Sequence, residues 1–180
     1  MTSFKEYQTI ALNYEGPYRK LEVPGLAPYD PGRMIHTALG IATETLEIQE
    51  IMRRKSLDLT DLLLELGDLC WFCAVACSEL QKLPPHPSAI ERPNLWTMAK
   101  KSERYVSRIK AGFAYGSLER EDDVPGSWAF LPGEIFTIAS TIGGSLAPDA
   151  DILNMNLKKL RTRYPEGKFS SSQALARRPG

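Results

Sequence analysis

Four acidic residues form two short pairs whose spacing could bring them together around a metal ion. Glu44 and Glu47 are three residues apart, as are Glu65 and Asp68, and 17 residues separate Glu47 from Glu65. On an α-helix, a spacing of three places both side chains of a pair on one face. The short connector predicts that the two helices are antiparallel neighbours. We therefore expect the four carboxylates to converge between these helices.

A cluster of this kind needs a counter-charge. Four neighbouring carboxylates repel one another, and burying them without a partner is costly. A hard divalent cation resolves the conflict, and all-oxygen ligands favour Mg²⁺ or Mn²⁺ over Zn²⁺. The alternative is that these residues are ordinary solvated charges, which is the usual explanation for a single E-x-x-E pair. Two pairs that each border an apolar face favour the metal site.

The helix expected to carry Glu65 and Asp68 runs from about residue 58 to residue 80, and Asp58 or Thr60 could cap its start. Its apolar residues follow alternating steps of four and three, the spacing of a packed bundle helix. This stripe consists of Leu62, Leu66, Leu69, Cys73, Ala76 and Leu80. Because Glu65 and Asp68 flank the stripe, they lie at the edge of the buried face.

The helix expected to carry Glu44 and Glu47 spans 34–54 and has two apolar faces, which predicts a central place in a bundle. One face holds Met34, Ile41, Ile48 and Met52, and the other holds Ile35, Leu39, Ala42 and Leu46. The remaining stripe carries His36, Gly40, Glu44, Glu47 and Glu50. We expect that stripe to face a cleft.

The rest of the chain predicts further helices separated by loops. Helical periodicity continues in segments 4–14, 95–110, 134–143 and 148–163, with Pro148 in the first turn of the last. Proline and glycine mark loops at 16–33, 83–94 and 111–133. Strand-like alternation is scarce, so we predict an all-α bundle of about five to six helices. We expect one domain over residues 1–169 and a disordered tail over 170–180.

Composition excludes several classes of protein. The 180 residues include 22 basic and 22 acidic side chains, so the chain lacks the basic footprint of a protein that binds a nucleic acid polymer. No apolar run approaches the length of a membrane span, and the first residues do not resemble a secretory signal. The three cysteines fall within eight residues and fit a helix core better than a disulfide framework or metal site. A reducing cytoplasm is the expected location.

Three segments together resemble the MazG-like family of the all-α nucleoside triphosphate pyrophosphohydrolases. They are GIATETLE (40–47), LLLELGDLCWF (62–72) and NLKKLRTRYP (156–165). These match the order of the family motif: E-x-x-E, a connector, E-x-x-D, then N-x-x-K-L with R-Y-P. The resemblance covers about residues 4–82 and 134–169. Leu46 replaces a frequent glycine and Leu64 a frequent glutamate, and 83–133 reads as an insertion containing a helix and a loop.

The resemblance implies Mg²⁺-dependent hydrolysis between the α and β phosphates of a nucleoside triphosphate, giving a monophosphate and pyrophosphate. Glu44, Glu47, Glu65 and Asp68 would be the metal ligands, and Glu44 or Glu47 would take a proton from the attacking water. The resemblance implies that substrate is bound by Asn156, Lys159, Arg163 and Tyr164. His36 is a further substrate-binding candidate because it lies on the same stripe as the carboxylates. Asn156 would contact substrate or organise the site, and Lys159 and Arg163 would bind phosphates.

Several alternatives stay open at this point. His36 lies about 12 Å along the helix from Glu44, so it would reach the base or sugar of a nucleotide, or it is a partly exposed histidine near a helix start. Trp71 and Phe72 are interpreted as core or interface residues in preference to a stacking platform. Long apolar stripes predict a homodimer or homotetramer. A nucleotide-binding regulator with weak or no turnover and a helical interaction protein are the two rival functions.

Overall fold

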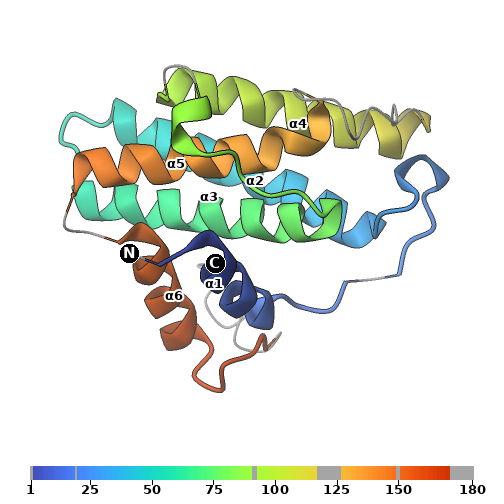
Figure 1. Ribbon diagram of the computed structural model, residues 1–180, viewed down its shortest axis with the longest axis horizontal. Helices are drawn as coiled ribbons and strands as arrows, with labels where there is room; N and C mark the ends of the chain where they lie inside the picture. Colours follow the sequence, from blue (N-terminus) through green and yellow to red (C-terminus); the bar gives the residue numbers. More distant parts are fainter. Residues whose placement is uncertain (1, 19, 91–92, 117–126, 149–150, 171–180) are drawn as a thin grey trace.

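The computed structural model describes residues 2–18, 20–90, 93–116, 127–148 and 151–170. These segments contain six α-helices and no strand, which confirms the all-α prediction (Figure 1). The helices are α1 (Phe4–Ala11), α2 (Pro31–Arg53), α3 (Leu59–Leu80), α4 (Leu95–Tyr115), α5 (Leu131–Leu146) and α6 (Ile152–Arg163). Short 3₁₀ turns occur at Leu12–Tyr14, Pro24–Leu26, Pro87–Ala89 and Trp128–Phe130. Within the described segments, no helix combines the length and apolarity that crossing a membrane requires.

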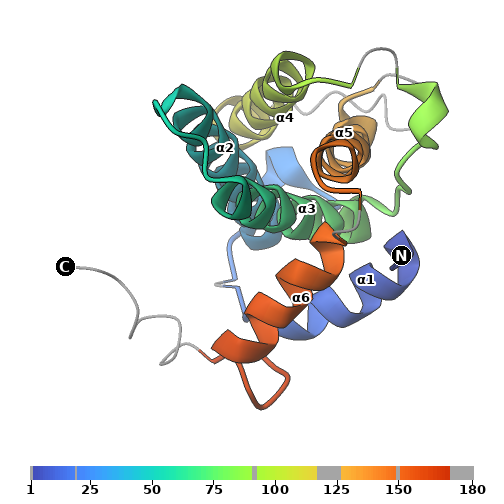
Figure 2. The same cartoon turned by 90° about the vertical axis from the view of Figure 1, so that its left-hand side faces the viewer.

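Helix α3 is the centre of the bundle. It contacts α2 and α5 on one side, and α1 and α6 lie across its other side (Figure 2). Helix α4 completes the bundle by packing against α2 and α5. Every residue of the apolar stripe predicted for α3 is buried, from Leu62 to Leu80. The three cysteines of this helix are buried as well, as expected for core residues.

The helix starts are specified by side chains that accept hydrogen bonds from the first free backbone N–H groups. Ser3 and Glu6 form a reciprocal capping box at α1, and Asp58 caps α3, one of the two predicted alternatives. Asp30, Asn94 and Asp151 cap α2, α4 and α6. Asp151 also accepts hydrogen bonds from the backbone N–H and hydroxyl of Thr2, so the first residues of the chain hold the start of α6.

Several predicted boundaries were wrong. Both ends of 111–133, predicted as a loop, are helical: α4 continues to Tyr115 and α5 begins at Leu131. Gly25 lets the preceding loop pack against α4, since a Cβ atom at position 25 would lie 2.2 Å from the carbonyl oxygen of Gly112, and Gly116, with φ of 67°, ends the helix. Pro148 does not start the last helix, since Asp151 caps it. Residues 117–126 and the predicted tail beyond residue 170 lie outside the described segments.

Helix α4 belongs to the core and is not an appendage to it. Tyr105 and Ser102 are buried against α2, where their hydroxyls contact Thr37 at 3.1 Å and Thr45 at 3.0 Å. Lys101 pairs with Glu134 of α5 at 2.7 Å. The idea that 83–133 is an insertion relative to a shorter family pattern stays a prediction. Its helix is nevertheless required to cover one side of the bundle.

The second apolar face predicted for α2 is largely exposed, which corrects the expectation of a fully central helix. Leu39 and Leu46 are 61% and 58% exposed. The described neighbours of α2 are α3 and α4, and they cover the face with Met34, Ile41 and Ile48. The second face therefore remains in contact with solvent in the described structure.

Candidate active site

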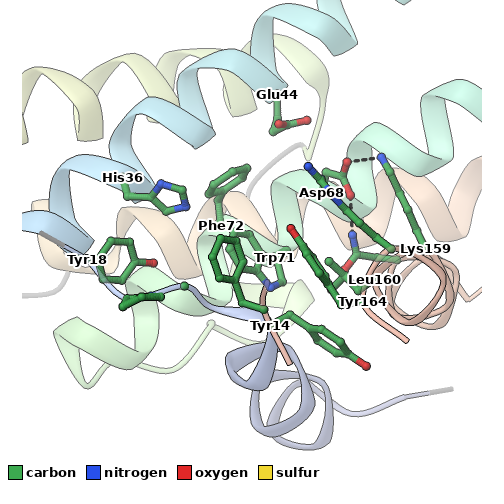
Figure 3. Close-up of a pocket in the computed structure, with 15 residues that line it drawn as sticks. Tyr14, Tyr18, His36, Glu44, Asp68, Trp71, Phe72, Lys159, Leu160 and Tyr164 are labelled. Atoms are coloured by element: carbon green, nitrogen blue, oxygen red, sulfur yellow. Dashed lines mark hydrogen bonds and ion pairs between the residues drawn. The ribbon is translucent and has the colours of Figure 1, made fainter. Parts of the chain in front are cut away.

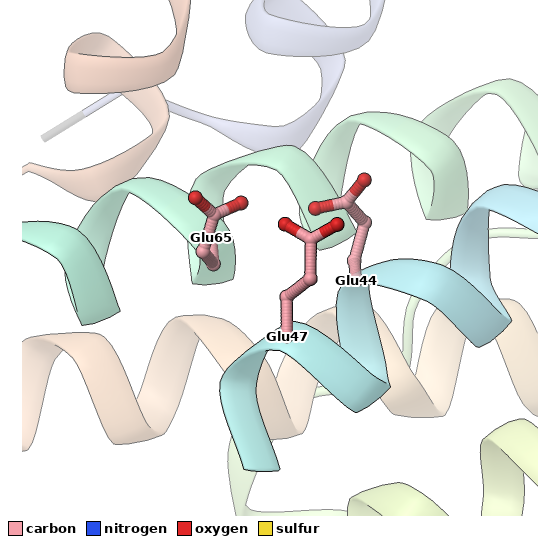
Figure 4. A group of neighbouring side chains, drawn as sticks. All are labelled: Glu44, Glu47 and Glu65. Carbon is pink, nitrogen blue, oxygen red and sulfur yellow. The ribbon is translucent and has the colours of Figure 1, made fainter. Parts of the chain in front are cut away.

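Three of the four predicted metal ligands converge between α2 and α3. One carboxylate oxygen from each of Glu44, Glu47 and Glu65 lies within 4.8 Å of the others (Figure 4). The five-residue connector after α2 makes the two helices neighbours, and the spacing of three turns Glu44 and Glu47 toward Glu65. This part of the arrangement follows the sequence pattern.

Glu44 is the most constrained of the three. Its Oε2 atom is buried and has no hydrogen-bond partner within the described structure. Burial, followed by the charge of Asp68, raises the pKa of Glu44 to about 9. Glu47 is exposed, but desolvation and the charge of Glu65 still raise the pKa of its carboxyl group. At neutral pH, Glu44 therefore retains its proton unless a cation compensates the charge.

Asp68 is held by α6 instead of joining the close cluster. Its Oδ1 accepts a hydrogen bond from Asn156 Nδ2 at 2.6 Å, and its Oδ2 pairs with Lys159 Nζ. Asn156 is buried and in turn accepts a hydrogen bond from the hydroxyl of Tyr7 at 2.7 Å. Burial raises the pKa of Asp68, and Lys159 opposes that effect. These bonds fit the site-organising role, one of the two predicted for Asn156, and that role stays a prediction.

A glycine allows α6 to come close enough to make these bonds. A Cβ atom at Gly67 would lie 3.0 Å from Asn156 Cβ and 3.1 Å from the carbonyl oxygen of Ile152. Both separations are tighter than ordinary van der Waals contact. Gly67 immediately precedes Asp68, so the close crossing of α3 and α6 places Asn156 and Lys159 directly at its carboxylate.

A cavity of about 400 Å³ opens beside Glu44 and Asp68 (Figure 3). Its walls come from α2, α3, α6 and the segment after α1, so it collects side chains from distant parts of the sequence. Besides the two carboxylates, the lining includes Tyr14, Tyr18, His36, Trp71, Phe72, Asn156, Lys159, Arg163, Tyr164 and Phe169. The volume falls within the range of small-molecule sites.

Aromatic rings form the end of the cavity that is remote from the carboxylates. The ring centroids of Tyr18 and Phe72 each lie 5.3 Å from that of His36, and the Trp71 centroid lies 6.0 Å away (Figure 3). Trp71 is fixed in place because its Nε1 donates a hydrogen bond to the carbonyl oxygen of Ala11 at 3.1 Å. Although His36 is partly open to solvent, desolvation by the surrounding rings lowers its pKa, which favours the neutral imidazole. The ring can then offer one donor and one acceptor to a ligand.

The α6 side of the cavity carries two cations. Burial would lower the pKa of Lys159, but the nearby Asp68 raises it, so the amine stays charged. The Nε atom of Arg163 is buried without a hydrogen-bond partner in the described structure. Its guanidinium carbon lies 5.4 Å from the ring centroid of Tyr164, which is itself buried. A free N–H donor on a cation beside a cavity suits an anionic ligand.

The wall formed by Tyr14 and Tyr18 is tied to the bundle by an ion-pair network. Arg33 of α2 binds both carboxylate oxygens of Glu15 at 2.6 Å, and it pairs with Glu79 of α3 at 2.9 Å. The side chain of Glu15 is only 7% exposed, so this bidentate pair is well shielded from water. Arg33 therefore fixes the segment that closes one side of the cavity.

The donor set fits a hard divalent cation. Three carboxylates approach one another, and one of their oxygens is buried without a protein partner. Oxygen-only ligands of this kind suit Mg²⁺ or Mn²⁺. Glu44, Glu47 and Glu65 would hold the ion, and Asp68 could join them if Lys159 turned away from it.

No family model matches the chain. No curated protein or solved structure is significantly similar to it either.

The sequence missed the aromatic part of the site. Trp71 and Phe72 pack against the core, in line with their interpretation as core residues, but both also line the cavity. Tyr14 and Tyr18 also line it, although Tyr14 was expected only as part of the first helical segment and Tyr18 only as part of a loop. One usable signal was the position of Trp71, which is three residues after Asp68 and therefore on the same side of α3.

Proposed function

We propose that this protein is a divalent-cation-dependent nucleoside triphosphate pyrophosphohydrolase. It would cleave between the α and β phosphates and release a nucleoside monophosphate and pyrophosphate. The observation that carries the proposal is the composition of the cavity. Acidic residues and cations meet at one end, and four rings meet at the other. A nucleotide has the matching division between a charged phosphate chain and an aromatic base.

The residues divide into three roles. Glu44, Glu47 and Glu65 would hold the cation, which supplies charge neutralisation and a more acidic bound water. Lys159 and Arg163 would contact phosphate oxygens and stabilise the charge that develops during cleavage. His36, Trp71 and Phe72 would surround the base, so the metal-ligating and base-binding groups face different parts of one ligand.

Asn156 acts on the substrate through Asp68. It donates to Asp68 and accepts from Tyr7, so it fixes the orientation of that carboxylate. The proton acceptor is assigned to Glu47 or Glu44. Glu47 is the better candidate, because it is exposed to entering water while Glu44 is half-buried and its Oε2 atom is enclosed. The resemblance of the three sequence segments to the MazG-like family supports the same assignment.

Pyrophosphate release from the eight common ribo- and deoxyribonucleoside triphosphates tests this proposal. The purified protein is assayed with Mg²⁺, with Mn²⁺ and with chelator. We expect cation-dependent pyrophosphate from at least one substrate, and loss of activity in Glu47→Gln. Glu50→Gln, an exposed change on the same helix, is the matched control and should keep its activity. Release of single phosphate as the first product, or no turnover of any substrate, would contradict the proposal.

A further inference from the structure

Gly40 lies between His36 and Glu44 on α2, one helical turn from each. A Cβ atom at this position would lie 2.2 Å from both Cδ1 and Cε1 of Phe72. The Phe72 ring therefore rests directly on the backbone of α2, where only glycine leaves room for it. Phe72 also lines the cavity, and its ring lies 5.3 Å from His36. Its position consequently sets how much space remains between α2 and the opposite wall.

The spacing of these three residues matches the length of a nucleoside. His36 and Glu44 are eight residues apart, about 12 Å along the helix axis. A base and sugar would span that distance if the base faced His36 and the first phosphate faced Glu44. The Phe72 ring would then lie beside the base or the base–sugar junction.

Resting on the proposed function, we propose that the contact between Gly40 and Phe72 determines which size of nucleobase the enzyme accepts. An alanine at position 40 would push the ring roughly 1.2–1.5 Å toward the cavity to reach ordinary van der Waals separation. The rings of His36 and Trp71 already lie 5.3 Å and 4.8 Å from the Phe72 ring between centroids, so they restrict how it can absorb that shift. Gly40 thus admits purines, and a side chain at this position selects against them in favour of pyrimidines.

The test compares Gly40→Ala with Gly144→Ala. Gly144 is also helical, but a Cβ atom there would meet nothing within 4 Å, so it controls for the general effect of alanine in a helix. For parent and variants, kcat/KM is measured for ATP and GTP against CTP and UTP. Dissociation constants of AMP, GMP, CMP and UMP are measured by calorimetry, and thermal melting checks the fold.

Gly40→Ala should lower the purine-to-pyrimidine ratio by at least about tenfold, whereas Gly144→Ala should leave it unchanged. Phe72→Leu should raise the ratio, and combining it with Gly40→Ala should restore the parent value. If Gly40→Ala does not fold, Phe72→Leu still tests the proposal. An equal loss for all bases, an unchanged ratio, or a parent that excludes purines would overturn it. A parent that neither binds nor hydrolyses any nucleotide would instead refute the proposed function.

Discussion

Replacing Glu44 with glutamine should raise the melting temperature of the metal-free protein, by an amount that grows with pH. In the parent, burial and the charge of Asp68 raise the pKa of Glu44 from its ordinary 4.5 to about 9. When folding raises the pKa of an acid, the free energy of unfolding is unaffected below the unfolded-state pKa. As the pH rises from that value toward the folded-state pKa, the unfolded chain loses the proton first, and the free energy of unfolding falls. Glutamine has a similar shape and no proton to lose, so the variant escapes this loss.

The size of the effect follows from the window between the two pKa values, 4.5 and about 9. Across this window the group is deprotonated only in the unfolded state, which lowers the free energy of unfolding by about 1.4 kcal/mol per pH unit. Because Glu44 is only partly shielded from water, we expect roughly 1 kcal/mol per unit. For a chain of this length, the gap in melting temperature should widen by roughly 4–8 °C between about pH 6 and about pH 8.

Thermal unfolding followed by circular dichroism in chelator, at several pH values, measures this gap. Glu50→Gln, exposed on the same helix, should melt like the parent throughout. Adding Mg²⁺ should reverse the order of parent and Glu44→Gln, since only the parent gains the full mass-action stabilisation of a bound ion. The reasoning fails if the difference in melting temperature between parent and Glu44→Gln does not change with pH, or if the variant melts lower in chelator. Either result would mean that the charge of Glu44 is not an unpaired, desolvated charge in the metal-free protein.

Three further substitutions test the cation, the cavity wall and the helix crossing. Lys159→Ala should lower kcat/KM by about 100-fold or more, while Mg²⁺ binding measured by calorimetry persists. The exposed Lys158→Ala is the control, and equal effects of the two changes would contradict the role of Lys159. A lysine at position 33 cannot reproduce the bidentate pair with Glu15, so Arg33→Lys should raise KM for nucleotide several-fold and leave Mg²⁺ affinity unchanged. An unaltered KM would count against a role of the Tyr14–Tyr18 wall in binding nucleotide. Gly67→Ala should force α6 away and cost roughly 1–3 kcal/mol in chemical denaturation, together with a fall in activity; parent-like stability would mean that the crossing adapts easily.

The sequence was sufficient for the elements that depend on local pattern. The apolar stripe of α3 and the cap at Asp58 were predictable because periodicity and capping act within one helix. The convergence of Glu44, Glu47 and Glu65 was predictable because a short connector joins two adjacent helices. The bounds of α4 and α5 were not, since their internal glycines and prolines also fit a loop.

The contacts that depend on how distant helices pack could not be predicted from the sequence pattern. Gly67 and Gly40 are ordinary helical glycines in sequence, and only the packing of Asn156 and Phe72 against them reveals their importance. The partnership of Lys159 with Asp68 was hidden for the same reason. Lys159 was expected to face phosphate, but the structure also makes it the counter-ion of a predicted metal ligand.

The two halves of the site have very different chain separations, which bears on the order of folding. Glu44, Glu47 and Glu65 meet within a single helical hairpin, a local contact that forms early because little loop entropy is lost. Asp68 and Lys159 are 91 residues apart, and Tyr7 and Asn156 are 149 apart. We therefore expect the acidic half to assemble first, with Asp68 lacking its counter-ion Lys159 until α6 docks. Helix α6 completes the site by bringing Lys159 to Asp68, whereas repulsion among the three glutamates persists in the folded, metal-free protein.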